Sequence, residues 1–206
     1  MTGAADVPRL GLSRLSLLLS PKKAVLAVRF VAAGKVPQAA EFDQQGLTLS
    51  EQEEDMLTMW LADGLATKVC EETHSKDGTI KLLLELQDGK KVETVAMPVG
   101  ACCVSSQVGC AVGCKFCASG LFGVERHLTT DEIVEQVVHA RRLMRIDRVV
   151  FMGMGEPSHN LDNVLAAVKR IKDEVLISPR RQTLSTIGSV SAIERIRAAS
   201  VRPCLA

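Results

Sequence analysis

The sequence has very few aromatic side chains, with no tyrosine, one tryptophan and five phenylalanines among its 206 residues. Proteins that bind single-stranded nucleic acid by stacking need several aromatic rings, so base stacking is excluded as a main binding mode. The formal net charge is only +1, which provides no global field to attract nucleic acid. The second half is more basic, with 14 basic and 10 acidic residues after position 100, which permits an RNA substrate without requiring one.

The sequence also lacks a long apolar run. No segment approaches the roughly 18–20 apolar residues that a membrane-spanning helix needs. The short apolar patch at residues 15–19 lacks the basic start and the small-residue cleavage site of a secretory signal. We therefore expect a cytoplasmic protein that does not contact a membrane and whose thiols stay reduced.

Cysteine is present in an odd number and is unevenly distributed. Three of the seven cysteines, Cys110, Cys114 and Cys117, lie within eight residues of one another. In a reducing compartment this pattern indicates metal or redox chemistry rather than a disulfide framework. Thiolates suit iron–sulfur clusters and also zinc, so the spacing alone leaves both open. A structural zinc ion would need a fourth ligand from Cys102, Cys103 or His127.

The patterning divides the chain into two expected domains, residues 1–98 and residues 99–206. The first is an N-terminal accessory region in which helices precede a small antiparallel β meander. Ser75-Lys-Asp-Gly78 and Asp88-Gly89 supply the turns of the meander. The expected helices are residues 10–20, 22–33 and 51–62, and the expected strands are residues 67–72, 79–87 and 91–97.

The second domain alternates strands with helices. Thr129-Thr-Asp-Glu132 is a capping-box sequence that predicts the start of a helix, and the apolar run at residues 149–152 predicts a buried strand. This alternation predicts an α/β fold with a parallel sheet, either a barrel or an open doubly wound sheet. The expected strands are residues 102–108, 148–152, 182–187 and 201–206, and the expected helices begin near residues 129, 160 and 190.

Several longer motifs resemble one known family. They are Cys103-Val-Ser-Ser-Gln-Val-Gly-Cys110, Gly153-Met-Gly-Glu-Pro157, Asn160-Leu-Asp-Asn-Val164 and Thr183-Leu-Ser-Thr186. With these motifs in this order, residues 92–206 resemble the RlmN/Cfr family of radical S-adenosylmethionine (SAM) RNA methyltransferases. The resemblance implies a partial (β/α) radical SAM barrel, incomplete at residue 206, with a small helical and antiparallel-β accessory domain.

The same resemblance implies two cofactors, a 4Fe–4S cluster and SAM. Three cysteine ligands leave one iron open, and in this superfamily that iron binds SAM, which is then cleaved to a 5′-deoxyadenosyl radical. From the residues alone, the glycines of residues 153–157 would let the backbone approach a ligand, although a plain turn is the competing interpretation. By resemblance the cluster ligands are Cys110, Cys114 and Cys117, and the SAM contacts are Gly155, Glu156, Ser185 and Phe116.

Two further residues take catalytic roles by resemblance. Cys103 matches the family cysteine that attacks a methylene cross-link between the RNA and a second, methyl-carrying cysteine. Glu93 matches a glutamate that removes the ring proton before this cross-link breaks, and a solvent-facing strand glutamate is the alternative. We expect Cys102 to be a buried strand cysteine and all four histidines to lie on the surface.

The implied substrate is adenine in 23S ribosomal RNA, at C2 more than C8, with tRNA as a second substrate, and the implied electron donor is a one-electron reductant such as flavodoxin. Cys204 does not match the methyl-carrying cysteine, so we expect this chain alone to be inactive in methyl transfer. The alternatives are a radical SAM enzyme with a different substrate and an inactive or zinc-binding fragment. Two arginine groups could either contact phosphates or lie in solvent: Arg141, Arg142, Arg145 and Arg148, and Arg180-Arg181.

Overall fold

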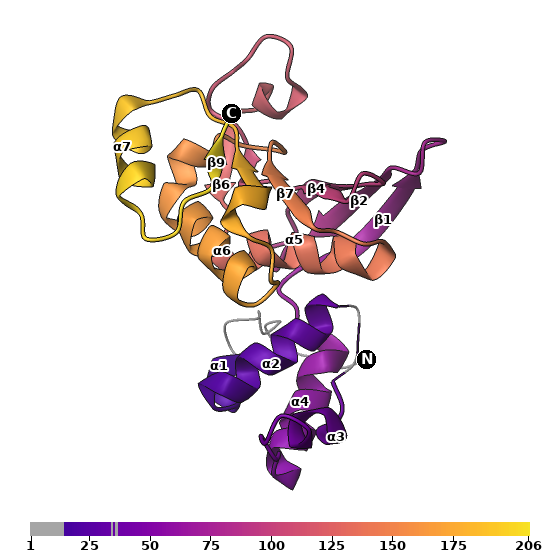
Figure 1. The fold of residues 1–206 in the computed structure, drawn as a ribbon. Coiled ribbons are helices and arrows are strands. Elements are labelled where there is room, and N and C mark those ends of the chain that lie inside the picture. The colour runs from indigo at the N-terminus through magenta and orange to yellow at the C-terminus, as the bar shows by residue number, and fades with distance from the viewer. Residues whose placement is uncertain (1–14, 34, 36) are drawn as a thin grey trace.

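The computed structural model describes residues 15–33, 35 and 37–206 (Figure 1). A bundle of short helices lies below a twisted sheet that carries its own helices. The helices are α1 (Leu15–Leu18), α2 (Pro21–Ala32), α3 (Ala39–Asp43), α4 (Glu51–Asp63), α5 (Thr130–Leu143), α6 (Leu161–Asp173) and α7 (Val190–Ala198), with 3-10 turns η2 (Ala118–Gly120), η3 (Pro157–Asn160) and η4 (Pro179–Arg181). The strands are β1 (Lys68–His74), β2 (Ile80–Glu85), β3 (Lys91–Met97), β4 (Ala101–Cys103), β5 (Gln107–Gly109), β6 (Val124–His127), β7 (Arg148–Phe151), β8 (Gln182–Leu184) and β9 (Cys204–Leu205). Of the helices described, none is long and apolar enough to cross a lipid bilayer.

The N-terminal bundle is stabilised by a helix cap and an ion pair. The Ser50 hydroxyl accepts a hydrogen bond from Glu53 N at 3.3 Å, and the Glu53 carboxylate accepts one from Ser50 N at 2.9 Å, which is a capping box. Lys23 pairs with the same carboxylate at 2.6 Å and so connects α2 to α4. The helices predicted at 22–33 and 51–62 are confirmed, α3 was not predicted, and residues 10–14 of the remaining predicted helix lie outside the described residues.

Seven strands form one sheet in the order β1-β2-β3-β4-β7-β8-β9. Strands β1 to β4 pair antiparallel, whereas β4, β7, β8 and β9 pair parallel, so β4 belongs to both arrangements. The predicted meander and the predicted α/β fold class are confirmed. The predicted boundary after residue 98 falls inside this sheet, because Val95 of β3 pairs with Cys103 of β4.

The single strand predicted at residues 102–108 is wrong, because the chain leaves the main sheet after Cys103. Strand β5 pairs instead with β6 in a separate two-stranded sheet. The side chain of Gln136 in α5 accepts a hydrogen bond from Ser105 N at 2.7 Å and donates one to Ser105 O at 3.0 Å. A buried side chain thus satisfies both backbone groups that a continuing strand would have used. The strands predicted at 148–152, 182–187 and 201–206 are confirmed and are shorter than predicted.

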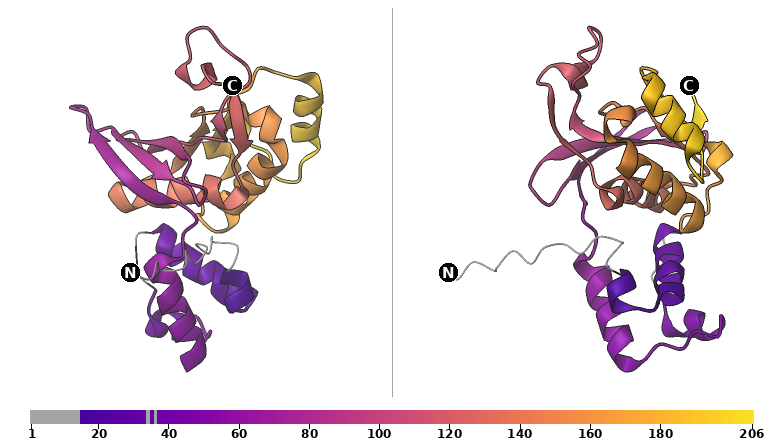
Figure 2. Two further views of the ribbon diagram at one scale, coloured as in Figure 1. Left: turned by 180° about the vertical axis from the view of Figure 1, so that it is seen from behind. Right: turned by 90° about the vertical axis from the view of Figure 1, so that its left-hand side faces the viewer.

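The sheet has one covered face and one open face. Cys102, Val149 and Leu184 are fully buried on the face that α5 and α6 cover (Figure 2), and Cys102 is the buried strand cysteine that was expected. Side chains alternate along a strand, so Cys103 and Val150 project from the opposite face, where both are half-buried. We call this second side the open face.

Helix α5 holds the link between the helical bundle and β1. The buried Glu135 carboxylate accepts hydrogen bonds from Ala66 N at 3.0 Å and Thr67 N at 2.8 Å. The Thr67 hydroxyl lies 2.9 Å from His139 Nε2. Burial raises the pKa of Glu135 to about 8 and lowers the pKa of His139 to about 4. The prediction that every histidine is exposed is wrong for His139, because α5 turns it towards this link.

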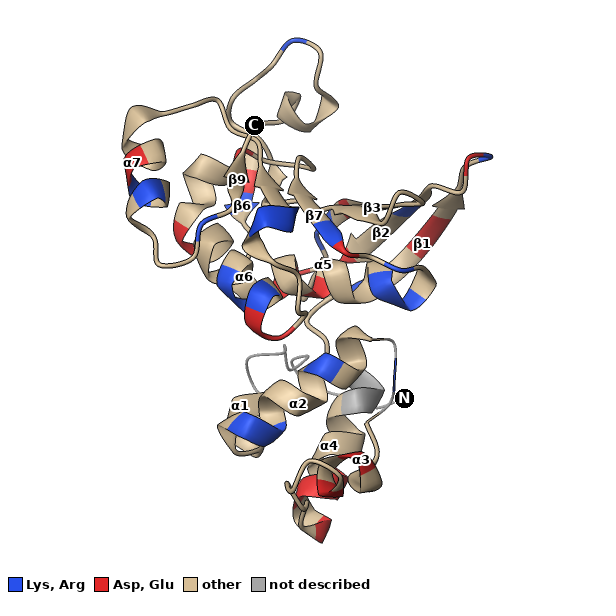
Figure 3. Ribbon diagram, in the orientation of Figure 1, with Lys and Arg blue, Asp and Glu red and all other residues tan. Residues whose placement is uncertain are grey.

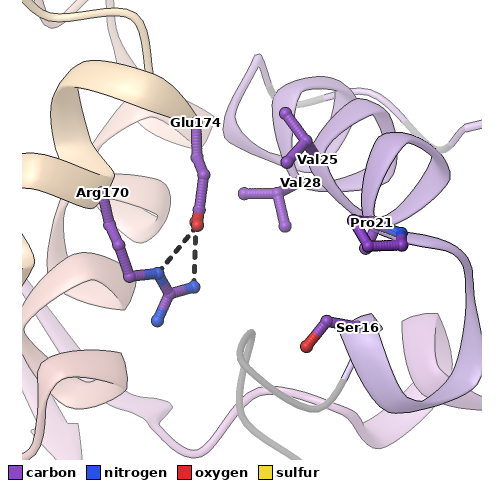
Figure 4. Close-up of a pocket in the computed structure, with 7 residues that line it drawn as sticks. Ser16, Pro21, Val25, Val28, Arg170 and Glu174 are labelled. Carbon is purple, nitrogen blue, oxygen red and sulfur yellow. Dashed lines mark hydrogen bonds and ion pairs between the residues drawn. The ribbon is translucent and has the colours of Figure 1, made fainter.

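A cavity of about 250 Å³ lies between the bundle and α6 (Figure 4). Arg170 of α6 and Glu174, the residue after its end, face α2 across the cavity and form a bidentate ion pair with both distances at 2.8 Å. Arg170 also pairs with Asp131 of α5 at 2.5 Å. The charged groups at this junction therefore pair with one another. The bundle side of the cavity consists of Ser16, Pro21, Ala24, Val25 and Val28.

Candidate active site

The three clustered cysteines lie on a loop of residues 110–123, here called the cysteine loop, which projects at the top of Figure 1. Strands β5 and β6 close its base, where Cys110 N donates a hydrogen bond to Gly123 O at 2.9 Å. Gly109 has a φ of +75°, and a Cβ on it would lie 2.0 Å from Gly123 O. Only glycine permits this close contact of the two ends of the loop.

Arg126 of β6 anchors the base of the cysteine loop to the rest of the fold. Its guanidinium pairs with Asp88 of the β2–β3 turn at 2.6 Å and with the buried carboxylate of Glu132 at 2.8 Å. Lys90 of the same turn pairs with Glu125 of β6. The base of the loop is therefore held by paired charges from two neighbouring elements.

The thiols of Cys110, Cys114 and Cys117 are free and half-buried. In the described parts of the chain, no three His, Cys, Asp or Glu side chains converge closely enough to hold one metal ion. Three soft thiols on one loop fit an iron–sulfur cluster better than zinc, which needs a fourth ligand. Of the fourth ligands considered, Cys102 is fully buried under the helices and His127 Nδ1 lies 2.9 Å from Gln107 Nε2.

A cavity of about 190 Å³ lies beside the base of the cysteine loop. Its walls include Val108, Ala118 and Phe122 from around the loop, and Met154 from the segment after β7. Phe116, which was predicted to contact SAM, is 93% exposed on the loop. The cysteine loop and the segment that contains Glu156 thus border the same cavity.

Residues 153–157, here called the Glu156 turn, follow β7 and pack along residues 104–107. Gly153 N donates a hydrogen bond to Val104 O at 3.1 Å, and Ser106 N donates one to Met154 O at 2.8 Å. Gly155 has a φ of +96°, and a Cβ on it would lie 2.6 Å from the Cβ of Gln107. Gly155 is therefore needed for the close contact between this turn and β5.

The carboxylate of Glu156 is buried, with the residue 6% exposed. It accepts hydrogen bonds from Thr186 Oγ1 at 2.5 Å, Ser158 N at 3.0 Å and Ile187 N at 3.2 Å. Burial alone would raise its pKa, but these hydrogen bonds outweigh burial and lower the pKa below its ordinary value. Within the described residues, no Lys, Arg or His side chain pairs with it. Buried charges in proteins normally have a charged partner, which an ammonium ligand would supply here.

Thr186, the neighbour of the predicted SAM contact Ser185, donates a hydrogen bond to the Glu156 carboxylate. Ser185 is half-buried, and its backbone N donates to Phe151 O at 3.4 Å just beyond the end of β8. Both residues belong to the motif at 183–186, but the sequence does not show which hydroxyl faces a carboxylate 30 positions away. Thr186 is the first site residue that sequence reasoning missed.

Gln107 is the second missed residue. It is fully buried, and its side-chain oxygen accepts a hydrogen bond from Glu156 N at 2.7 Å. Its side-chain nitrogen lies 2.9 Å from His127 Nδ1 on β6. One side chain thus connects the Glu156 turn to the strand that closes the cysteine loop. The available signal was its position three residues before Cys110, which does not reveal its partners.

Cys103 and Glu93 project from the open face of the sheet. Cys103 pairs in register with Val95, and Glu93 lies two residues before Val95, so all three share this face. Diagonal neighbours of this kind lie about 7–8 Å apart. Burial raises the pKa of Cys103, and the backbone of Met152 partly offsets this effect. The Glu93 carboxylate is exposed and pairs with Lys81 at 2.8 Å.

Comparison with known proteins gives the same family for sequence and for fold. The Radical SAM superfamily profile matches residues 104–202. A probable RNA methyltransferase of Stutzerimonas stutzeri is 45% identical over 165 residues, which are 76% of this chain and 48% of the relative. One from Leptothrix cholodnii is 46% identical over 144 residues, which are 70% of this chain and 41% of the relative. The chain thus spans about half the length of the curated relatives it matches.

A solved structure is similar over almost the whole chain. The crystal structure of a radical SAM methyltransferase from Sphaerobacter thermophilus superposes with a TM-score of 0.73 and 33% sequence identity. The superposition covers 97% of this chain and 62% of the other. Proteins of this family use a 4Fe–4S cluster and SAM, which suits a fold with three thiols on one loop and a buried carboxylate on another. The chain therefore belongs to the radical SAM superfamily, as a relative of its probable RNA methyltransferases.

Proposed function

We propose that this chain is the cluster- and SAM-binding part of a radical SAM RNA methyltransferase. The proposed substrate is adenine in 23S ribosomal RNA and also in tRNA, modified at C2 rather than C8. The printed names of the relatives and of the structural neighbour support the reaction class and an RNA substrate. The RlmN/Cfr motifs support the ring carbon and the cysteine relay. A one-electron reductant such as flavodoxin, and a division into residues 1–98 and 99–206, belong to the same proposal.

The proposed cofactor residues belong to the cysteine loop, the Glu156 turn and the end of β8, and the first two of these segments contribute walls to the 190 Å³ cavity through Ala118, Phe122 and Met154. When bound, the cluster would supply the single electron for the reductive cleavage of SAM. Glu156 would bind the SAM ammonium through a carboxylate that is already ionised and oriented. Gly155 would let the backbone approach the ligand, and Ser185 and Phe116 would make further contacts. Cys110, Cys114 and Cys117 would ligate three of the four irons.

Cys103 is the proposed thiol that resolves the RNA cross-link, and Glu93 is the proposed proton acceptor. Their positions on the open face support this assignment, because both would meet a substrate that enters from that side. Glu93 would first have to leave Lys81. Exposed ion pairs contribute only about 0–1 kcal/mol, so this rearrangement costs little. Cys103 would have to lose the proton that its raised pKa retains.

The single observation that carries the proposal is the buried, ionised carboxylate of Glu156 without a cationic partner in the described chain. Because the chain spans about half the length of its relatives, the test uses residues 1–206 fused to the remaining half of the Stutzerimonas stutzeri relative. The reconstituted fusion is incubated with a 23S ribosomal RNA fragment, reduced flavodoxin and SAM that carries a deuterated methyl group. We expect labelled 2-methyladenosine in the nucleosides and none from the matched Cys114→Ala fusion.

The other outcomes of this assay are also informative. Labelled 8-methyladenosine would show that the enzyme modifies C8 of adenine and not the proposed C2. Cleavage of SAM without any methyladenosine would contradict RNA as the substrate and indicate a different one. Stoichiometric zinc without labile sulfide after anaerobic reconstitution would overturn the cluster assignment.

A further inference from the structure

Two arginine groups that are distant in the sequence meet at one surface. Arg145 and Arg181 share the carboxylate of Asp147, at 3.4 Å and 3.0 Å. Arg148 begins β7, and Arg180 lies in η4, next to β9, where its carbonyl accepts a hydrogen bond from Cys204 Sγ at 3.5 Å. Figure 3 shows basic segments gathered near the start of β7 and the end of α5, on the side facing the viewer. We call Arg145, Arg148, Arg180 and Arg181 the arginine surface.

The arginine surface carries more positive charge than its own ion pairs neutralise. Four guanidiniums and the Asp147 carboxylate leave a net charge of 4 − 1 = +3. Arg148 and Arg180 are exposed, and their side chains have no ion-pair partner among the described residues. Arg141 provides the contrast, because its guanidinium donates to Ile146 O at 3.0 Å and Val175 O at 2.7 Å and so has a structural role.

We propose that the arginine surface binds the phosphate backbone of the RNA substrate. This inference rests on the proposed function, which names RNA as the substrate. A guanidinium presents a planar set of donors that matches two phosphate oxygens, and it stays charged at any physiological pH. Asp147 already orients two of the four guanidiniums, which lowers the side-chain entropy lost on binding.

The arginine surface lies at the opposite end of the parallel strands from the Glu156 turn. Arg148 is the first residue of β7, and the Glu156 turn follows its last residue. Four residues of strand span about 13 Å. At about 3.4 Å for each phosphate of one strand, roughly four nucleotides cover that distance. One RNA molecule could therefore contact the arginine surface while a nucleotide at its end reaches the site.

The test measures RNA binding of the full chain and of two triple variants by fluorescence anisotropy. The probe is a labelled RNA hairpin with adenine in its loop, titrated at several salt concentrations. The surface variant is R145A/R148A/R180A. The control, K35A/K68A/K76A, removes the same charge from exposed positions in the helical bundle and on the β meander. We expect the surface variant to bind at least about tenfold more weakly at low salt, with its salt slope reduced by about 2.

The outcomes separate this inference from the proposed function. If the unchanged chain binds the hairpin and both variants lose affinity equally, net charge explains the loss and the arginine surface is wrong. If the unchanged chain shows no salt-dependent RNA binding, both the proposal of an RNA substrate and the proposed role of the arginine surface are wrong. SAM affinity of the reconstituted surface variant should equal that of the unchanged protein, and a parallel loss would indicate misfolding. In that case the single variant R148A, at the exposed start of β7, is measured instead. A reduced salt dependence of its RNA affinity would support the arginine surface, and an unchanged one would contradict it.

Discussion

The two loops that border the 190 Å³ cavity are built in opposite ways. The Glu156 turn is hydrogen-bonded along its length to residues 104–107, and its acidic side chain is buried under three further hydrogen bonds. The cysteine loop is fixed at its base, while Phe116 and Phe122 on it are 93% and 94% exposed. The Glu156 carboxylate is thus held by its own hydrogen bonds, whereas the three thiols are half-buried on a loop that is fixed at its base.

This difference indicates what holds each loop of the site in its conformation. A buried carboxylate that is ionised must be held by its own protein neighbours, since desolvation would otherwise raise its pKa. A loop of thiols can instead obtain its order from the metal, because ligand binding and local folding are coupled. We therefore expect variants of the Glu156 turn to act on both stability and SAM binding. Variants of the cluster cysteines should act on metal content, and through the lost cluster on SAM binding, but not on the stability of the metal-free protein.

The largest expected effect follows from Cys114→Ala. Reconstituted protein should contain about four irons per chain, as the cluster type requires, and the variant should retain almost none. Its urea unfolding without metal should match that of the unchanged apoprotein, because none of residues 110–123 belongs to the buried hydrophobic core. Iron and sulfide assays and circular dichroism provide the measurements. Cys204→Ala, at an exposed cysteine outside the loop, is the control, and full iron retention in Cys114→Ala would refute the role of this thiol.

The next effect concerns Glu156→Gln, which keeps the size of the side chain and removes its charge. Loss of a charge-assisted hydrogen bond costs about 1.5–3 kcal/mol, so SAM affinity should fall about ten- to a hundredfold. Calorimetry on anaerobically reconstituted protein measures this, and iron content should not change. Glu72→Gln, at an exposed carboxylate on β1 away from both loops, should leave SAM affinity intact. Equal affinity in both variants would make Glu156 only a turn residue.

Gln107→Ala should weaken the connection between the two loops. The substitution leaves Glu156 N buried without its acceptor, which costs about 1–3 kcal/mol of unfolding free energy. Urea denaturation measures this cost, and SAM affinity should fall with it because the turn loses its anchor. His127→Ala removes the contact on the exposed side alone and should cost less than about 1 kcal/mol. A larger effect for His127→Ala would reverse the proposed order of importance.

The smallest effect is expected for Thr186→Val, which removes one of three donors to Glu156. A carboxylate with a lowered folded pKa contributes stability above its unfolded pKa, and this contribution is lost as pH falls through the folded pKa. With one donor removed the pKa of Glu156 should rise, so the midpoint of acid unfolding should move to higher pH. Fluorescence of the single tryptophan follows the transition. Ser185→Ala should leave the midpoint unchanged, and equal shifts would mean that both hydroxyls hold the carboxylate.

Elements with local signals could be predicted from the sequence. The capping box predicted at Thr129 is present, with its hydroxyl accepting from Glu132 N at 3.3 Å, and most of the apolar run at 149–152 lies in β7. The break after Cys103 could not be predicted, because it depends on Gln136, 31 residues beyond Ser105 in the chain. The same limit applies to the site. The motifs located its loops, but the contact between Thr186 and Glu156 depends on how two neighbouring strands end.

The contacts between Glu135, Thr67 and His139 make the attachment of the helical bundle a proton-linked joint. The folded protein keeps a proton on Glu135 that the unfolded chain releases between pH 4.5 and about 8, so stability falls as pH rises through this interval. His139 acts in the opposite direction, because below pH 6.5 the unfolded chain binds a proton that the folded protein does not bind until about pH 4. Stability therefore falls as pH falls through this interval. The pH dependences of stability from Glu135 and His139 therefore oppose each other up to pH 6.5. Above pH 6.5 Glu135 is the one of the two that still titrates, so mild alkalinisation weakens the attachment of the bundle to the sheet.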